Sequence, residues 1–348
     1  MKVLVTGAAG RMGAHLTRRL VAGGHEVRAF VLPGDPNNQA IDGPGVEVVP
    51  GRLEDVESVE KAVAGVDAIA ALAGALTSRL ASDRQFFDVN LGGTFNLLMA
   101  ARAHAPNLQR FVCASSDAVY WSGLEQTSRF LPIDETHPRE PYSIYGATKV
   151  GAEELALQFG RGFGIPSVVV RPTATADAWE LVEPDSVFGR RLFVRGAVRF
   201  LSSFTNPSPE ETDLLALLRD LDDGSDQLYV LADEGGVAPM SNLADARDLA
   251  QGLFLTLTRP EAVGEAFNLG PAGEHNEEGL VRHLAERLGV RYTVIPRPAV
   301  RPDWYVSSAR ATSVLGYRPE HTVFSMVDEA VAARAARPSA TATAAAAR

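Results

Sequence analysis

The first 175 residues alternate between short apolar runs and longer segments in which apolar residues recur with helical spacing. The short runs predict buried strands, and the segments between them predict amphipathic helices. Strands and helices in alternation predict a parallel sheet covered on both faces, and right-handed crossovers make it a doubly wound α/β sheet. The predicted strands are 2–6, 26–31, 46–49, 67–72, 109–115 and 166–171, and the predicted helices are 11–22, 55–64, 83–104 and 143–163.

A strand, a glycine-rich turn and a helix open the chain. The apolar run Lys2–Thr6 is followed by Gly7, Gly10 and Gly13, and the helical segment Arg11–Ala22 begins within the turn. This arrangement points backbone N–H groups at a pyrophosphate, and glycine is needed where the backbone approaches the ligand. A plain tight turn is the alternative, but the strand–helix context favours nucleotide binding. Ligands of such sheets bind at the carboxyl ends of the strands. At or just past those ends lie Gly7, Ala73, Ser116 and Arg171.

Tyr145 and Lys149 are four residues apart on a predicted helix, so their side chains share one face. A phenol is a poor base at neutral pH, and lowering its pKa to 7 takes roughly 3 units, or about 4 kcal/mol. A fixed ammonium nearby favours the phenolate. The pair is therefore a candidate proton-transfer device, although the same spacing also occurs on ordinary solvated helices.

These two features, with several others in a fixed order, resemble the extended branch of the short-chain dehydrogenase/reductase family, the NAD-dependent epimerase/dehydratase type. Residues 6–13 are similar to its Thr-Gly-x-x-Gly-x-x-Gly turn, and residues 115–120 to its Ser-Ser-x-x-Val-Tyr strand end. The other matching segments are 67–74, 88–94, 132–135 and 171–172. The resemblance covers about residues 1–175 well and continues more thinly through 245–250, 267–270 and 315–317.

The resemblance implies a Rossmann-type fold and an NAD(P)-dependent enzyme in which Tyr145 is the acid/base, Lys149 depresses its pKa and binds the nicotinamide ribose, and Ser116 binds the substrate oxygen. Ser115 would face away from the site, because alternate residues of a strand point to opposite faces. The cofactor-binding residues it implies are Gly7, Gly10, Arg11, Met12, Gly13, Leu53, Ala71, Ala73, Asn90, Tyr145 and Lys149. Candidate substrate residues are Ser116, Trp121, Arg171 and Trp179.

Each of these residues also has a plain structural interpretation. A serine at a strand end is usually a turn former, and a tyrosine in mid-helix is usually packing. Asn90 would otherwise be a helix cap, and Arg171 would form a salt bridge. Trp121 and Trp179 would stack on a sugar or base, or pack in a core or interface.

The end of the second predicted strand leaves NAD and NADP open. Val31 stands where NAD-specific members carry an acid, and Leu32 follows where NADP-specific members carry arginine. Asp35 lies a little further on and would reach the adenosine ribose, which favours NAD slightly. The basic residues that would meet a 2′-phosphate or the adenine are Arg11, Arg28 and Arg52.

The main functional hypothesis is a sugar or nucleotide-sugar epimerase or dehydratase that works through hydride transfer at a secondary alcohol. Thr173–Asp177 replaces the family's Asn and Tyr-Gly-Pro after Arg171-Pro172, and Trp121 replaces its glycine, so a nucleotide diphosphate tail is in question. A dehydrogenase or carbonyl reductase with net redox is the first alternative. The second is a dinucleotide-sensing regulator, which typically lacks the Tyr-x-x-x-Lys pair.

The composition limits the partners. Of the 348 residues, 46% are hydrophobic and 22% charged, and the net charge of −10 argues against nucleic acid or an anionic membrane as a main partner. Cys113, alone in the sequence, reads as inert packing, and the histidines do not fall at metal-ligand spacing. No charged leader precedes the first strand and no apolar stretch approaches membrane length, so we expect a cytoplasmic protein. The resemblance implies a homodimer through helices 83–104 and 143–163.

The alternation degrades after about residue 176. We expect a dinucleotide-binding domain over 1–175, to which 227–260 returns, and a smaller substrate lobe from 176–226 and 261–335. Further helices are predicted within 188–204 and 210–224, and at 243–257, 274–289 and 323–335. Residues 336–348 form an alanine-rich tail, frayed or disordered.

Overall fold

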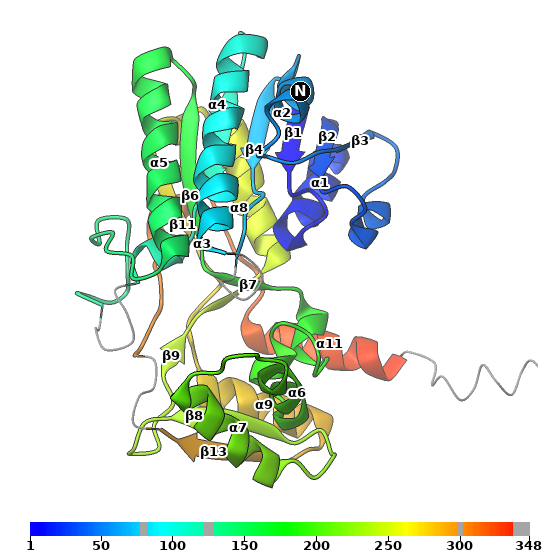
Figure 1. Ribbon diagram of the computed structural model, residues 1–348, viewed down its shortest axis with the longest axis vertical. Coiled ribbons are helices and arrows are strands. Elements are labelled where there is room, and N and C mark those ends of the chain that lie inside the picture. Colours follow the sequence, from blue (N-terminus) through cyan, green and yellow to red (C-terminus); the bar gives the residue numbers. More distant parts are fainter. Residues whose placement is uncertain (77–81, 122–127, 298–301, 337–348) are drawn as a thin grey trace, which may run out of the picture. The chain divides into compact units, whose positions relative to one another are not determined.

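A computed structural model describes residues 1–76, 82–121, 128–297 and 302–336 (Figure 1). The chain divides into two compact units. The first unit comprises Met1–Thr175, Ala246–Ala272 and Trp304–Glu320, and the second comprises Ala176–Asp245, Gly273–Asp303 and His321–Arg348.

A seven-stranded parallel sheet forms the centre of the first unit, in the order β11-β6-β5-β4-β1-β2-β3. Its strands are β1 (Lys2–Thr6), β2 (Glu26–Val31), β3 (Val46–Pro50), β4 (Ala68–Ala71), β5 (Arg110–Ala114), β6 (Ser167–Pro172) and β11 (Ala266–Leu269). The chain runs outward from β1 to β3 and then returns to β4 on the other side of β1. Between β1 and β4 the order reverses, which in such sheets marks the ligand crevice. The predicted doubly wound sheet is confirmed.

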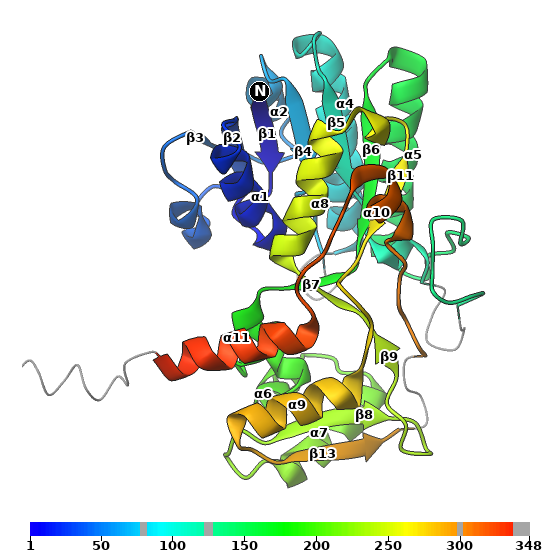
Figure 2. The same ribbon diagram turned by 180° about the vertical axis from the view of Figure 1, so that it is seen from behind.

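Helices cover both faces of this sheet. Helices α4 and α5 lie side by side on the face toward the viewer in Figure 1, and α8 lies on the opposite face, which Figure 2 shows from the front. Beneath α4 and α5, buried apolar residues such as Ile69, Leu98 and Phe111 form a continuous core. The helices are α1 (Arg11–Ala22), α2 (Val56–Val63), α3 (Asp83–Phe86), α4 (Gly93–His104), α5 (Ile144–Phe163), α8 (Ala246–Thr258) and α10 (Ala309–Leu315).

The single helix predicted over 83–104 is divided. A π-helix, η2 (Phe87–Gly92), separates α3 from α4. Two successive glycines, Gly92 and Gly93, are poor helix formers. A Cβ on Gly93 would lie 2.7 Å from the Cβ of Leu53, so the chain needs glycine there to pack closely. π-helical turns of this kind are often found at functional sites.

The second unit is built on two parallel strands, β8 (Leu228–Ala232) and β13 (Tyr292–Pro296). Buried side chains such as Val230, Leu284 and Met326 form its core. Its helices are α6 (Val194–Ser202), α7 (Pro209–Leu221), α9 (Glu277–Leu288) and α11 (Val323–Ala336).

Shorter elements occur in both units. The short strands are β7 (Ala174–Ala176), β9 (Met240–Ser241), β10 (Leu243–Asp245) and β12 (His275–Asn276). The short helices are η1 (Pro36–Ala40), η3 (Asp117–Val119), η4 (Ala178–Leu181), η5 (Gly189–Arg191) and η6 (Pro260–Ala262).

The division of the chain differs from the predicted one in two places. Residues 227–245 belong to the second unit, because β8 pairs with β13. Residues 261–272 and 304–320 belong to the first unit, because β11 extends the parallel sheet beside β6 and Tyr317 donates a hydrogen bond to the carbonyl of Gly270. Neither β8 nor β13 was predicted, since a five-residue apolar run has no distinctive period.

Candidate active site

The turn between β1 and α1 has the geometry of a phosphate-binding loop. Gly7 has φ +65°, and a Cβ there would lie 3.0 Å from the Cα of Ala73. A Cβ on Gly13 would collide with the carbonyl oxygen of Gly7. Helix α1 begins after Gly10 without a side-chain cap and without an acidic residue in its first turn, so its N-terminus favours an anion. The residues present therefore fit a dinucleotide pyrophosphate.

Thr6 fixes the neighbouring strand end. Its buried Oγ1 accepts hydrogen bonds of 3.0 Å from the backbone N–H groups of Leu72 and Ala73. The chain beyond β4 is thereby held across the mouth of the glycine turn. A Cβ on Gly74 would lie 3.2 Å from Lys149 Nζ, so the glycine lets this backbone pass directly over the lysine.

Tyr145 and Ser116 meet where α5 packs on the end of β5. Ser143 caps α5 by accepting a 3.0 Å hydrogen bond from the N–H of Gly146. A Cβ on Gly146 would lie 2.7 Å from the carbonyl oxygen of Ala118, so the first turn of α5 touches η3 closely. The Tyr145 hydroxyl is thereby brought close enough to Ser116 for that hydroxyl to act on its pKa. Burial raises the pKa of Tyr145 to about 12, the hydrogen bond with Ser116 opposes this rise, and the charge of Asp117 adds to it.

Lys149 is buried one turn after Tyr145. Its Nζ donates a 2.9 Å hydrogen bond to the carbonyl of Ala114 and lies 5.8 Å from the centroid of the Tyr145 ring. Burial lowers the pKa of Lys149, and electrostatic interactions with Cys113 and Glu153 oppose this. Within the described residues, one N–H of the Lys149 ammonium is bound by the Ala114 carbonyl. An ammonium has three N–H donors, so donors remain for a ligand hydroxyl.

Asn90, in the π-helix, ties the cofactor side of the site to α5. Its Oδ1 accepts from the N–H of Ala75 at 2.8 Å, and its Nδ2 donates to the Ala75 carbonyl at 3.1 Å and to Thr148 Oγ1 at 3.2 Å. Thr148 directly precedes Lys149. Asn90 therefore orders two segments of the site rather than capping a helix.

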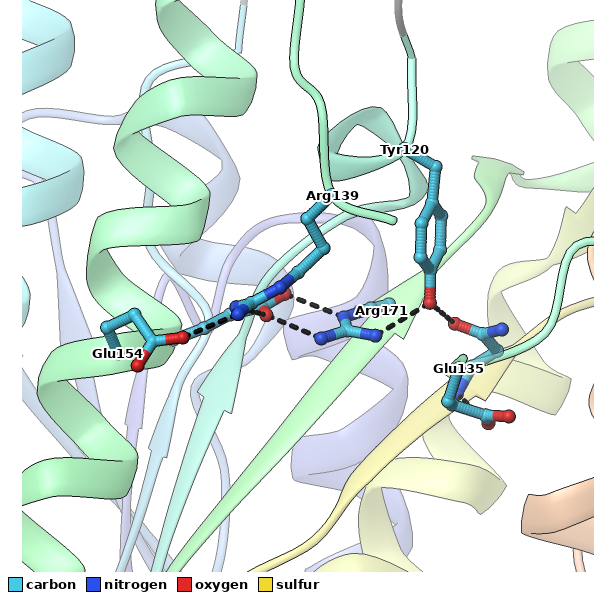
Figure 3. A network of polar contacts seen from close by, with 7 residues as sticks. Tyr120, Glu135, Arg139, Glu154 and Arg171 are labelled. Carbon is cyan, nitrogen blue, oxygen red and sulfur yellow. Dashed lines mark hydrogen bonds and ion pairs between the residues drawn. The ribbon is translucent and has the colours of Figure 1, made fainter. Parts of the chain in front are cut away.

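Arg171 is placed differently from its predicted substrate role. Its buried guanidinium binds both carboxylate oxygens of Glu153, at 2.8 and 2.7 Å, and donates to Tyr120 Oη at 2.7 Å (Figure 3). All three kinds of guanidinium nitrogen are thus engaged with the protein. Arg171 thus forms the salt bridge that was the alternative to a substrate contact, because its N–H groups are bound by Glu153 and Tyr120.

The two candidate tryptophans lie in different units. Trp121, in the first unit, packs against Trp304 with ring centroids 5.1 Å apart, and this pair borders a small core around Tyr120 and Ile133. Trp179, in η4 of the second unit, is half exposed. Two residues predicted beside the cofactor, Leu53 and Ala71, are buried in the core of the first unit, whereas Arg11 and Met12 at the start of α1 are partly exposed.

Beyond β2, Asp35 caps the short helix η1 by accepting a 2.9 Å hydrogen bond from the N–H of Asn37. Arg28 donates to Glu47 and to the carbonyls of Lys61, Ala62 and Ala64 at the end of α2. Nε and Nη1 of Arg28 are thus engaged with Glu47 and with the end of α2, and its contact with a 2′-phosphate stays a prediction.

In the part of the chain that the structure describes, no group of three or more His, Cys, Asp and Glu side chains has an arrangement that would hold a metal ion. Among the described helices, none combines the length and the apolar character that crossing a bilayer requires.

Comparisons with known proteins place this geometry in a family. The family model described as the NAD dependent epimerase/dehydratase family matches residues 3–177. A 4-hydroxy-2-methyl-3-oxo-4-farnesyl-3,4-dihydroquinoline-1-oxide ketoreductase of Stigmatella aurantiaca is 39% identical over 174 residues, 49% of this chain and 49% of that protein. The match thus spans about half of that relative. The UDP-glucose 4-epimerase of Lactobacillus helveticus is 26% identical over 333 residues, which cover 92% of this chain and 93% of the epimerase.

A solved structure matches nearly the whole chain. It is a short-chain dehydrogenase/reductase superfamily protein from Agrobacterium tumefaciens, crystallised with bound NAD. It superposes with a TM-score of 0.86 at 34% sequence identity, over 96% of this chain and 97% of that chain. The family model and this match together show that the chain belongs to the NAD-dependent epimerase/dehydratase family of extended short-chain dehydrogenases/reductases.

Proposed function

We propose that this chain is an NAD-dependent oxidoreductase that moves a hydride at a secondary alcohol of a polyhydroxylated small molecule, as a sugar or nucleotide-sugar epimerase or dehydratase does. The observation that carries the proposal is the contact of Tyr145 with Ser116, one helical turn from the buried ammonium of Lys149. A regulator that only senses a dinucleotide has no need of this arrangement.

The residues divide the chemistry among them. Tyr145 would pass a proton to or from the substrate oxygen, and Ser116 would bind the same oxygen. With a pKa of about 12, Tyr145 is a phenol near neutral pH and is therefore ready to donate a proton. Lys149 would hydrogen-bond the ribose beside the nicotinamide and favour the phenolate when the proton leaves. When bound, the nicotinamide supplies or accepts the hydride.

NAD is the cofactor we propose, with NADP as the alternative. The Agrobacterium tumefaciens protein, 34% identical, holds NAD. At the end of β2 the buried Val31 offers no carboxylate, whereas Asp35 lies four residues further on and is partly exposed. Arg52, exposed at the end of β3, favours NADP. Titrating the purified protein with NADH and with NADPH, followed by nucleotide fluorescence, decides between the two.

A ketoreductase or dehydrogenase with net redox is the second candidate. The 39% identical Stigmatella aurantiaca relative is a ketoreductase, and Trp121, which packs on Trp304, stands where the nucleotide-sugar enzymes usually carry a glycine. An epimerase restores its cofactor in each cycle and retains it, so purified protein would release stoichiometric nucleotide on denaturation and turn over without added NAD. A ketoreductase would need added cofactor for every turnover.

The role of Tyr145 is tested by Tyr145→Phe, assayed with sugars, UDP- and dTDP-sugars and small ketones. We expect the rate to fall about 10³-fold, because the proton donor is lost, while nucleotide binding persists. Tyr142→Phe is the matched control, since Tyr142 lies three residues away and is 76% exposed. Equal activity of the two variants would refute the proposal.

For the partners, we propose a homodimer formed through α4 and α5, in the cytoplasm and without nucleic acid or membrane. The support is the exposed apolar side chains of these helices, among them Phe95 and Phe163. The net charge of −10 further supports the absence of polyanionic partners.

A further inference from the structure

A fully buried carboxylate lies one turn beyond the Tyr145–Lys149 pair. Glu153 extends the pair to a stripe of three residues at four-residue spacing along α5, and its side chain has no exposed surface. Its oxygens are bound by Arg171, at 2.8 and 2.7 Å, and by Arg139, at 2.8 Å (Figure 3). Burying charged groups costs several kcal/mol per ion, so this cluster contributes little net stability by itself.

The cluster joins α5 to the segment that carries Ser116. Arg171, at the end of β6, donates to Tyr120 Oη, which donates in turn to Asn268 Oδ1 of β11 at 2.8 Å. Tyr120 lies four residues after Ser116, just past η3. A single chain of hydrogen bonds thus connects the helix of Tyr145 and Lys149 with the strand end of their partner hydroxyl.

Glu153 also carries a negative charge that acts on the buried ammonium of Lys149. Two groups oppose the effect of burial on the lysine, Cys113 and Glu153. Burial raises the pKa of the Cys113 thiol to about 12, so the thiol is neutral near pH 7. The carboxylate of Glu153 is left as the compensating charge, four residues along the same helix face.

We propose that Glu153 is a positioning residue of the active site: clamped by Arg171 and Arg139, its carboxylate fixes α5 against the segment that follows Ser116, and its charge, four residues along the helix, helps to keep the Lys149 ammonium in place for Tyr145. This inference rests on the proposed function of the pair. It adds a residue that touches neither cofactor nor substrate and acts through Lys149.

The test compares Glu153→Gln with Glu154→Gln in the full-length chain. Glu154 pairs with the same Arg139 but is about half exposed. Glu154→Gln therefore removes one negative charge, as Glu153→Gln does, but leaves the surroundings of Lys149 unchanged. Removing the charge of Glu153, and leaving Arg171 uncompensated, lowers the pKa of Lys149. The alkaline limit of NADH binding, measured by fluorescence against pH, should therefore move down by about one pH unit in Glu153→Gln. The turnover rate should fall at least tenfold with little change in KM, and Glu154→Gln should overlay the wild type.

Other outcomes overturn the proposal. A Glu153→Gln protein that melts at a lower temperature but keeps the wild-type pH limit and turnover rate would make the residue merely structural. If Glu153→Gln does not fold, Glu153→Asp replaces it: the charge is kept and the reach is shortened, so we expect an unchanged pH limit with a reduced turnover rate, and an unchanged rate refutes the clamp. Wild-type protein that binds no NADH would instead refute the proposed function itself.

Discussion

Adjacent serines at the end of β5 differ in what they touch. Ser116 Oγ accepts a 3.1 Å hydrogen bond from the N–H of Ala118 and lowers the pKa of Tyr145, whereas Ser115 Oγ is buried and has no partner among the described residues. We predict that Ser116→Ala slows alcohol oxidation about 10²-fold. Because Ser116 lowers the pKa of Tyr145, its loss raises that pKa, and the low-pH limb of the oxidation profile, where the rate falls as Tyr145 becomes protonated, should move to higher pH. Ser115→Ala is the control and should retain the wild-type profile; a shift in both variants would contradict the assignment.

At this scale the sequence was informative where a residue's partner is local. Tyr145 and Lys149 share a helix, so their common face was predictable from their spacing, and Ser116 was predicted from the resemblance of residues 115–120 to the family's strand end. The partners of Arg28 and Arg171 were not predictable, because they lie on segments distant in the sequence, at the end of α2 and on α5. Glu153 was missed, although its four-residue step beyond Lys149 is a signal that the printed sequence contains.

Helix α5 offers a test of close packing with an internal control. Replacing a helical glycine by alanine normally stabilises a helix by about 0.5–1 kcal/mol. At Gly146 a Cβ would lie 2.7 Å from the Ala118 carbonyl and 2.8 Å from Pro141 Cβ, so we predict that Gly146→Ala lowers the melting temperature and displaces Tyr145 from Ser116. At Gly162 of the same helix a Cβ meets nothing within 4 Å, so Gly162→Ala should raise the melting temperature.

Thermal unfolding and turnover of the two glycine variants check this prediction together. Gly146→Ala should lose turnover rate more than substrate affinity, and Gly162→Ala should lose neither. Stabilisation by both changes would mean that α5 can move away from η3 without cost, and that the close approach does not set the position of Tyr145.

Elements whose boundaries follow local chemistry were predicted closely, and those set by tertiary contacts were not. The six strands of the amino-terminal alternation match within one or two residues, as does α1, which begins after Gly10 and ends at Gly23. The predicted helix 83–104 is divided next to Gly93, which packs closely on Leu53, and those two residues are 40 positions apart in the sequence.

For the whole molecule, the assignment of chain segments to the two units was the hardest feature to predict. Three separate segments build the first unit. The four residues of β11 complete its sheet only because β6 presents a free parallel edge, and nothing in Ala266–Leu269 itself specifies that partner. Such short apolar segments become strands through long-range pairing.

The assembly of the molecule is the last property that can be tested. On α4 and α5 a cluster of phenylalanines reaches the surface: Phe95 and Phe163 are 43% and 50% exposed, and Phe159 contacts both at 6.2 and 5.0 Å between ring centroids. Exposed apolar clusters of this kind favour association with a second copy. We predict that wild-type protein has twice the chain mass by light scattering, and that Phe95→Asp with Phe163→Asp yields the monomer. Val237→Asp changes a still more exposed apolar residue of the second unit and should leave the dimer intact. A monomeric wild type, or loss of the dimer in all variants alike, would contradict this interface.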